Sequence, residues 1–188
     1  KEPWYPGDSV NVGIGQGFMV ATPIQIATAN AAMAARGHMY YPRMVNEVDN
    51  APVTFEGNEG VEHEIVLKDQ RNWERMVRAM EKVITDARGT GRRLQGTEYT
   101  IAGKTGTGQV FSLADDQEYD ADSLDKRLHD HALFIGFAPA EKPKIAVFAI
   151  FENGGSSSKP ADLTKALFDA YLYDDYPQEY DYFEEQRR

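Results

Sequence analysis

Apolar residues recur at helical spacing in an alanine-rich stretch near the start of the chain, residues 22–37. Thr22 can cap a helix that Pro23 begins, and Gln25 stands where its side chain closes a capping box. Gly37 is a stop signal at the other end. The pattern predicts a helix over residues 22–37 whose alanines pack closely against neighbouring elements.

A second helical pattern runs from about Asp69 to Arg88 and ends at Gly89. Its apolar stripe predicts a face buried in the core, not a cofactor site. The stripe consists of Trp73, Met76, Val77, Met80 and Ile84.

Three later stretches have the composition of strands: residues 98–111, 131–138 and 144–152. Pro139 and Pro143 bracket a short turn between the last two, which predicts an antiparallel hairpin. These two stretches are almost continuously apolar and do not alternate with polar residues. Such a pattern predicts burial on both faces and therefore helices on both sides of the sheet.

Three further segments complete the expected organisation. A final helix from about Ala161 to Tyr173 would cover one face of the sheet, and the acidic segment 112–130 is long enough to be a functional or mobile loop. The polar, acidic tail 174–188 is expected to be frayed. The opening letters KEPWYPGDS contain neither an initiator methionine nor a polar linker, so we expect a chain entered partway along a longer one.

Charge and cysteine content narrow the function classes. A formal net charge of −10 and a pI near 4.9 argue against a nucleic-acid partner or an anionic lipid surface, which need a clustered basic face. There are no cysteines, so neither a disulfide nor a thiolate zinc site exists within this chain. The longest apolar run, residues 145–151, is too short to span a bilayer, so we expect any membrane anchor to lie outside this chain.

The pair His129 and His131, with Asp130 between them, invites a metal interpretation. A closed metal site needs four ligands, and no further ligands stand at useful spacing. We therefore favour histidines at the surface or the edge of the core, with a structural hydrogen bond for Asp130 and His131. No metal and no other cofactor is predicted.

The sequence AGKTGTGQVF at residues 102–111 is compatible with two unrelated chemistries. A phosphate-binding loop requires a glycine five positions before the glycine of its Gly-Lys-Thr, and that position is Glu98. Such a loop must also open a helix, whereas Thr107 and the residues after it favour a strand. The spacing and the context both argue against nucleotide binding.

On a strand beside a cleft, these residues suit acyl transfer. Lys104 brings a positive charge that favours a substrate carboxylate and helps a nearby hydroxyl lose its proton. Thr105 offers a hydroxyl donor, and Gly106 lets an extended substrate approach and pair with the strand. The amide of Thr107 could point into the cleft as an oxyanion donor. On the triplet alone, a simple turn is the alternative.

Other segments of the chain support the same interpretation of the Lys-Thr-Gly triplet. Residues 104–111, KTGTGQVF, resemble the third motif of the penicillin-binding proteins and serine β-lactamases. Residues 7–27 look like the segment of class B penicillin-binding proteins that combines Gly-Gln-Gly with Thr-Pro-x-Gln. RLHDHALFIGFAP and AIFENGG are similar to later strands of the penicillin-binding protein 2 subfamily. The resemblance runs in order from about Trp4 to Tyr173.

The resemblance implies the α+β penicillin-recognising fold, an antiparallel sheet flanked by helices on both faces. Residues 1–173 would be only the C-terminal part of a transpeptidase domain. It implies a peptidoglycan D,D-transpeptidase that works through a serine acyl-enzyme and is trapped by β-lactams. By this analogy the hydroxyls of Thr105 and Thr107 hold the donor carboxylate, Lys104 supports the proton network, and the Thr107 amide shares the oxyanion.

The family also needs an upstream Ser-x-x-Lys motif on a buried helix and a Ser-x-Asn motif. The letters of the first recur at residues 123–126 and 156–159, but both copies follow the Lys-Thr-Gly strand. The letters of the second recur at residues 9–11, inside the Gly-Gln-Gly segment. We interpret all three as coincidences and expect this chain alone to be inactive without the upstream part that carries the nucleophile.

Two other functions stay open on the sequence. A D,D-carboxypeptidase or β-lactamase would pass the acyl group to water, and a non-catalytic sensor domain would bind β-lactams without turnover. The resemblance favours a transpeptidase on the periplasmic face of the bacterial inner membrane. Its implied partners are stem peptides, the upstream part of the same protein, and the glycosyltransferase and scaffold proteins of the elongation machinery.

Overall fold

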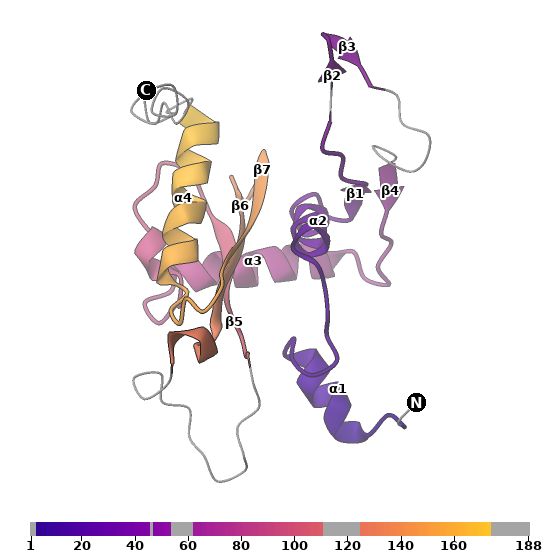
Figure 1. Cartoon of the computed structure of the whole chain (residues 1–188). Coiled ribbons are helices and arrows are strands. Elements are labelled where there is room, and N and C mark those ends of the chain that lie inside the picture. The colour runs from indigo at the N-terminus through magenta and orange to yellow at the C-terminus, as the bar shows by residue number, and fades with distance from the viewer. Residues whose placement is uncertain (1–2, 46, 54–61, 111–124, 174–188) are drawn as a thin grey trace.

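The largest sheet has three antiparallel strands in the order β5-β6-β7 (Figure 1). The computed structural model describes residues 3–45, 47–53, 62–110 and 125–173. The strands are β5 (Ala102–Gly108), β6 (His131–Ala138) and β7 (Ile145–Phe151). The predicted hairpin is confirmed as the antiparallel β6-β7 pair. The predicted strand 98–111 is shorter than expected, and among the described strands it forms an edge of the sheet with only β6 beside it.

Helices cover both faces of this sheet, as the apolar strands predicted. Helix α4 (Ser158–Tyr173) lies on one face and α2 (Pro23–Ala34) lies on the other, while α3 (Arg71–Thr85) packs against β5 and contributes side chains to the cores of both faces (Figure 1). Each face has its own core. The α4 face buries Ile84, Leu94, Ile101, Phe134, Ala138, Ala161 and Phe168. The opposite face buries Ala34, Val77, Met80, Ala102, Phe137 and Ala140.

Helix α2 has the predicted start and a slightly earlier end. The capping box is present, because the Gln25 amide donates to Thr22 Oγ1 at 3.4 Å and the Thr22 amide donates to Gln25 Oε1 at 2.9 Å. The helix ends at Ala34. Gly37 follows with φ of +104°, and a Cβ there would lie 2.7 Å from the Ile65 carbonyl oxygen. Only glycine therefore suits this exit from the helix.

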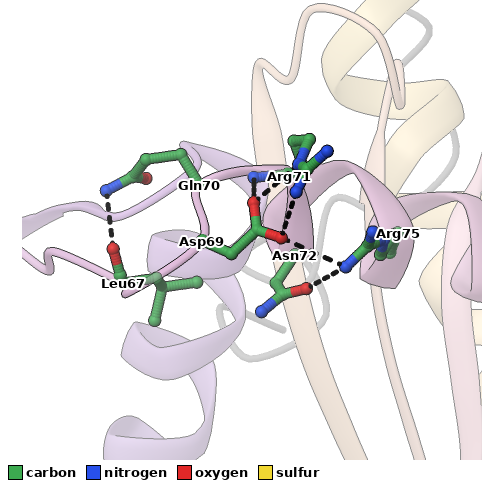
Figure 2. Close-up of polar contacts among 6 residues, drawn as sticks. All are labelled: Leu67, Asp69, Gln70, Arg71, Asn72 and Arg75. Carbon is green, nitrogen blue, oxygen red and sulfur yellow. Dashed lines mark hydrogen bonds and ion pairs between the residues drawn. The ribbon is translucent and has the colours of Figure 1, made fainter.

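The start of α3 is organised by one carboxylate (Figure 2). Asp69 accepts a hydrogen bond from the Arg71 amide at 3.0 Å and another from the Arg71 guanidinium at 2.9 Å. A second guanidinium nitrogen of Arg71 donates to the other Asp69 oxygen at 3.0 Å, and Arg75 adds a fourth contact at 3.3 Å. The hydrogen bonds from Arg71 lower the pKa of Asp69 below its usual value. An anion here also suits the positive end of the helix dipole.

The predicted apolar stripe of α3 is correct except at one position. Trp73, Val77, Met80 and Ile84 are buried. Met76 is 48% exposed and faces a cavity between α2 and α3. The spacing places Met76 on the apolar side of the helix, but no described side chain covers it fully.

Several short elements carry little hydrophobic periodicity and were not predicted. In the segment 12–18, Gly15 and Gly17 have positive φ. The short elements are α1 (Pro6–Gly13), β1 (His38–Tyr40), β2 (Glu47–Val48), β3 (Ala51–Pro52), β4 (Glu62–Glu64), η1 (Arg92–Leu94) and η3 (Lys126–Leu128). Most of the acidic segment 112–130 and all of the tail 174–188 lie outside the described residues.

Helix α4 is held to the sheet by packing and by a polar cluster. Phe168 is fully buried, and Tyr99 packs against its ring edge to face at 6.3 Å. The Tyr99 hydroxyl donates to Asp169 Oδ1 at 2.6 Å, and Lys165 bonds the other oxygen. Burial raises the pKa of Tyr99, and the bond to Asp169 raises it further. Burial opposes ionisation of Asp169, but the bonds from Lys165 and Tyr99 outweigh it and lower the pKa of Asp169.

Replacing Phe168 by alanine should lower the free energy of unfolding by about 3–5 kcal/mol, because a fully buried ring leaves a cavity in the α4 core. Leu167 is the matched control, since it is 42% exposed on the same helix. Leu167→Ala should change the free energy of unfolding by less than about 1 kcal/mol. Urea titration measures both, and equal losses would contradict the assigned faces of α4.

Replacing Tyr99 by phenylalanine should flatten the pH dependence of stability in alkali. The pKa of Tyr99 is raised in the folded protein, so its contribution is complete below the unfolded pKa of about 10 and is lost as pH rises toward the folded pKa. Urea titrations between about pH 8 and 11 should show a steeper loss for the unsubstituted protein. Tyr171→Phe, at a 56% exposed position, is the control. Parallel profiles for all three proteins would contradict the prediction.

Candidate functional site

The Lys-Thr-Gly residues lie in the middle of an extended strand. Lys104 pairs with Ile135 and Thr107 with Ala132 in the antiparallel ladder between β5 and β6. The chain stays extended from Ala102 to Gly108, so no helix begins at this motif. The rejection of a phosphate-binding loop is therefore confirmed, and the simple-turn alternative is wrong.

Lys104 combines an apolar environment with a polar tip. Its side chain helps line a cavity of 460 Å³ between α2 and α3, where most of the wall is apolar. Its Nζ donates to the Thr105 carbonyl oxygen at 2.7 Å and to Thr105 Oγ1 at 3.2 Å. The methylene stem therefore covers apolar wall while the ammonium group reaches the outer edge of β5.

The backbone groups of Thr105 and Thr107 face the open edge of the sheet. The Thr105 carbonyl accepts from Lys104 Nζ, and the Thr107 carbonyl accepts from Gln16 Nε2 at 3.1 Å. Neither bond comes from β6. In a strand the N–H and C=O of one residue point to the same side, so the Thr107 amide also points outward from the edge. An amide in this position is available to an anion outside the sheet.

Two of the three glycines of β5 have tight neighbours within the protein. A Cβ on Gly106 would lie 3.1 Å from Leu133 Cβ, and a Cβ on Gly103 would lie 2.6 Å from Phe134 Cζ. The sequence explained Gly106 by the approach of a substrate. The structure adds a second reason, because the sheet itself leaves little room for a side chain there.

Gln16 reaches this strand, which the sequence did not predict. It lies between Gly15 at φ +79° and Gly17 at φ +66°, just after α1, and its own amide donates to the Asn11 carbonyl at 2.9 Å. The alternating glycines were the available signal, because two positive-φ residues turn the backbone and direct the side chain between them. Its contact with Thr107 joins residues 91 positions apart.

Thr90 is a second residue that the sequence missed. Its Oγ1 lies 2.9 Å from Thr105 Oγ1. Thr90 sits in the connection between α3 and η1, between Gly89 and Gly91. Its contact with the motif depends on the fold, since residue spacing alone does not show which loop meets the edge of β5.

Asn30 ties α2 to the sheet beneath the cavity. Its Nδ2 donates to the Gly136 carbonyl at 2.8 Å and to the Val147 carbonyl at 3.1 Å. The side chain is buried, and its Oδ1 has no hydrogen-bond partner among the described residues. Asn30 thus fixes the distance between α2 and two strands, next to the wall that Lys104 lines.

Two of the three coincidental serine motifs lie in the described part of the chain, and their first serines make local hydrogen bonds. Ser9 lies in α1 and accepts a hydrogen bond from Trp4 Nε1 at 2.9 Å. Ser156 precedes α4, and its hydroxyl contacts that of Ser158 at 3.1 Å. Residue 123 lies outside the described part of the chain.

The histidine pair belongs to the end of the β6-β7 hairpin. His131 Nδ1 accepts from the Asn153 amide at 2.9 Å, and the Asn153 side chain donates to the carbonyls of Arg127 and His129. A structural hydrogen bond of His131 is therefore confirmed.

Within residues 3–45, 47–53, 62–110 and 125–173, no three acidic, histidine or cysteine side chains gather as metal ligands would. Across the same residues, every helix falls short of the length and apolarity that a bilayer crossing needs.

Comparison with known proteins gives consistent matches. The family described as "Penicillin binding protein transpeptidase domain" matches residues 1–172. The "Peptidoglycan D,D-transpeptidase MrdA" of Haemophilus influenzae is 39% identical over 180 residues, which cover 95% of this chain and 28% of that protein. The chain thus spans little more than a quarter of the length of this curated relative.

Solved structures agree with the sequence matches. A crystal structure of Pseudomonas aeruginosa PBP2 in complex with WCK 5153 is similar at a TM-score of 0.75 and 39% identity, over 96% of this chain and 36% of that one. A complex between PBP2 and MreC from Helicobacter pylori gives a TM-score of 0.70 at 25% identity, over 92% of this chain and 29% of that one.

Replacing Gly103 by alanine should destabilise the protein by about 1–3 kcal/mol, because the new methyl group would overlap Phe134 in the α4 core. Gly108→Ala is the matched control on the same strand, since its Cβ would lie 3.5 Å from Leu133 Cδ1, an ordinary contact. Thermal unfolding measures both variants. Equal melting temperatures would contradict the predicted crowding at residue 103.

Proposed function

Because this chain belongs to the penicillin-binding protein transpeptidase family, we propose that residues 1–173 are the C-terminal part of the transpeptidase domain of a peptidoglycan D,D-transpeptidase of the class B, penicillin-binding protein 2 type. The observation that carries the proposal is the edge of β5. One ammonium group, two threonine hydroxyls and an outward-facing amide lie within four consecutive residues of this strand.

The reaction would proceed in two steps. A serine from the upstream part attacks the carbonyl of the penultimate D-alanine of a donor stem peptide, the peptide bond to the terminal D-alanine breaks, and that residue leaves as a free amino acid. The amine of an acceptor stem then attacks the acyl-enzyme ester, a new peptide bond forms, and the serine recovers its proton. β-Lactams would stop at the ester, because their leaving group stays attached.

Each residue of the motif has a role in these steps. The Thr107 amide stabilises the oxyanion of the tetrahedral intermediate, where one such donor contributes about 3–4 kcal/mol. The hydroxyls of Thr105 and Thr107 bind the terminal carboxylate. Lys104 places a positive charge beside that carboxylate and supports proton transfer from the serine. Gly106 leaves the strand open for an extended donor peptide.

The upstream part of the protein would pack beside Lys104 and along the first residues of this chain. Apolar side chains are strongly exposed in that segment, with Val20 at 92%, Ile14 at 73% and Phe18 at 67%. The cavity at Lys104 is lined mainly by α2 and α3 and has apolar walls. Apolar surface of this kind favours a partner element, and the relatives are several times longer than this chain.

The proposal also covers further partners and a location. We propose that the whole protein is anchored outside this chain in the bacterial inner membrane and that the domain faces the periplasm. Its partners would be an elongation glycosyltransferase and scaffold proteins, and the Helicobacter pylori PBP2 structure is a complex with MreC.

The decisive test uses the complete protein. It should become covalently labelled by a fluorescent penicillin, and it should join donor and acceptor stems in a cross-linking assay. Labelling without cross-linking would favour a sensor, and release of D-alanine without cross-linking would favour a carboxypeptidase. No labelling would contradict the proposal altogether.

Replacing Lys104 by alanine in the complete protein should slow acylation by a fluorescent penicillin at least about 100-fold, because the charge beside the carboxylate and the nucleophile is lost. The melting temperature should stay nearly unchanged, since the Lys104 side chain is exposed. Lys142→Ala, in the exposed turn between β6 and β7, should acylate at the normal rate. An unaltered rate for Lys104→Ala would remove this lysine from the mechanism.

A further inference from the structure

We propose that Thr90 is a positioning residue for carboxylate recognition: its hydroxyl donates to Thr105 and so directs the single Thr105 proton toward the carboxylate of a donor peptide or β-lactam. The inference rests on the proposed function of β5. It assigns a role to the connection between α3 and η1, which lies outside the Lys-Thr-Gly motif.

The contact is short and joins two separate elements. Thr90 Oγ1 lies 2.9 Å from Thr105 Oγ1, which is a normal length for a bond between two hydroxyls. The same Thr105 oxygen lies 3.2 Å from Lys104 Nζ. Thr105 Oγ1 is therefore the middle member of a chain of three polar groups.

The backbone around Thr90 is held by the end of α3. The Gly91 amide donates to the Val83 carbonyl at 2.9 Å, and the Gly89 amide donates to the Asp86 carbonyl at 2.9 Å. A Cβ on Gly89 would lie 2.2 Å from the Val83 oxygen, and one on Gly91 would lie 2.6 Å from Ile84 Cδ1. Because both glycines are needed for this close approach, the loop presents Thr90 to β5 in a fixed place.

When a carboxylate is bound, the numbers of protons and lone pairs on Thr105 Oγ1 decide which hydroxyl donates in the Thr90–Thr105 hydrogen bond. Thr105 Oγ1 has two lone pairs and one proton. The Lys104 ammonium group has only protons to offer, so it occupies one lone pair. A carboxylate has only lone pairs, so it must receive the Thr105 proton. The bond to Thr90 must then use the second Thr105 lone pair, and Thr90 is the donor.

Loss of the Thr90 hydroxyl would leave the Thr105 hydroxyl in place but remove the group that orients it. The second lone pair would be left to water, and the hydroxyl would no longer be held in one rotamer. Binding of a carboxylate would then have to order the hydroxyl as well as bond it. We therefore expect a weaker effect than loss of Thr105 itself, and one that depends on the ligand carboxylate.

The test compares Thr90→Val and Thr90→Ser in the complete protein. Acylation rate constants are measured with a fluorescent penicillin and with its methyl ester, which lacks the anionic carboxylate. Thr90→Val should react about tenfold more slowly with the free acid, the effect of one hydrogen bond to a charged ligand. With the ester it should match the unsubstituted protein, and Thr90→Ser should be close to normal with both.

Two controls separate this role from a purely structural one. Thr85→Val removes an exposed hydroxyl on α3 that donates to the Glu81 carbonyl at 3.1 Å, and it should leave both rates unchanged. The double variant Thr90→Val/Thr105→Val should be acylated by the free acid no more slowly than Thr105→Val alone. The Thr90 hydroxyl acts only through the Thr105 hydroxyl, so its loss has no further effect once Thr105 is replaced. Melting temperatures of all variants should agree closely.

Three results would overturn the inference. The first is an unchanged free-acid rate in Thr90→Val while Thr105→Val is slow, which would leave the proposed function intact. The second is an equal loss for the acid and the ester. The third is failure of the unsubstituted protein to react with the acid at all, which would overturn the proposed function and this inference together.

Discussion

Within the described part of the chain, β5 pairs with a neighbouring strand on one side only, and the candidate site depends on this. Strand β6 bonds the inner edge of β5, and the outer edge keeps the backbone groups of Thr105 and Thr107 directed away from the sheet. An exposed edge is normally a liability, because it invites pairing with other chains. Here the open edge is short and carries a charged lysine, features that limit aggregation and that also fit the proposed extended donor peptide.

The open edge requires a rigid support, and the two cores supply it. Helix α4 packs on one face and α2 on the other, α3 contributes to both cores, and Asn30 bonds two strands from the α2 side. A strand fixed on both faces and along one side has little freedom to move. The positions of the Lys104 ammonium group and the Thr107 amide therefore follow from packing some distance away, as preorganised electrostatic stabilisation requires.

Much of this could be predicted from the sequence, for identifiable reasons. Strand β6 and helix α2 were found because apolar runs, caps and glycine stops are local signals. The motif itself was found because its spacing excluded a phosphate loop. Met76 was misplaced because helical spacing gives the side of a helix but not the extent of its cover. Gln16 and Thr90 were missed because their contacts cross 91 and 15 positions of chain and depend on how loops meet β5.

The contact of Gln16 with the Thr107 carbonyl has a consequence for any ligand that lies along β5. A side-chain amide already occupies one lone pair of that oxygen, with the same chemistry as a peptide N–H. An arriving peptide must either share the oxygen or displace the glutamine, and displacement exchanges one amide bond for another of similar strength. The net free energy gained at this carbonyl is then small, so discrimination between ligands falls to the charged Lys104 and the hydroxyls beside it.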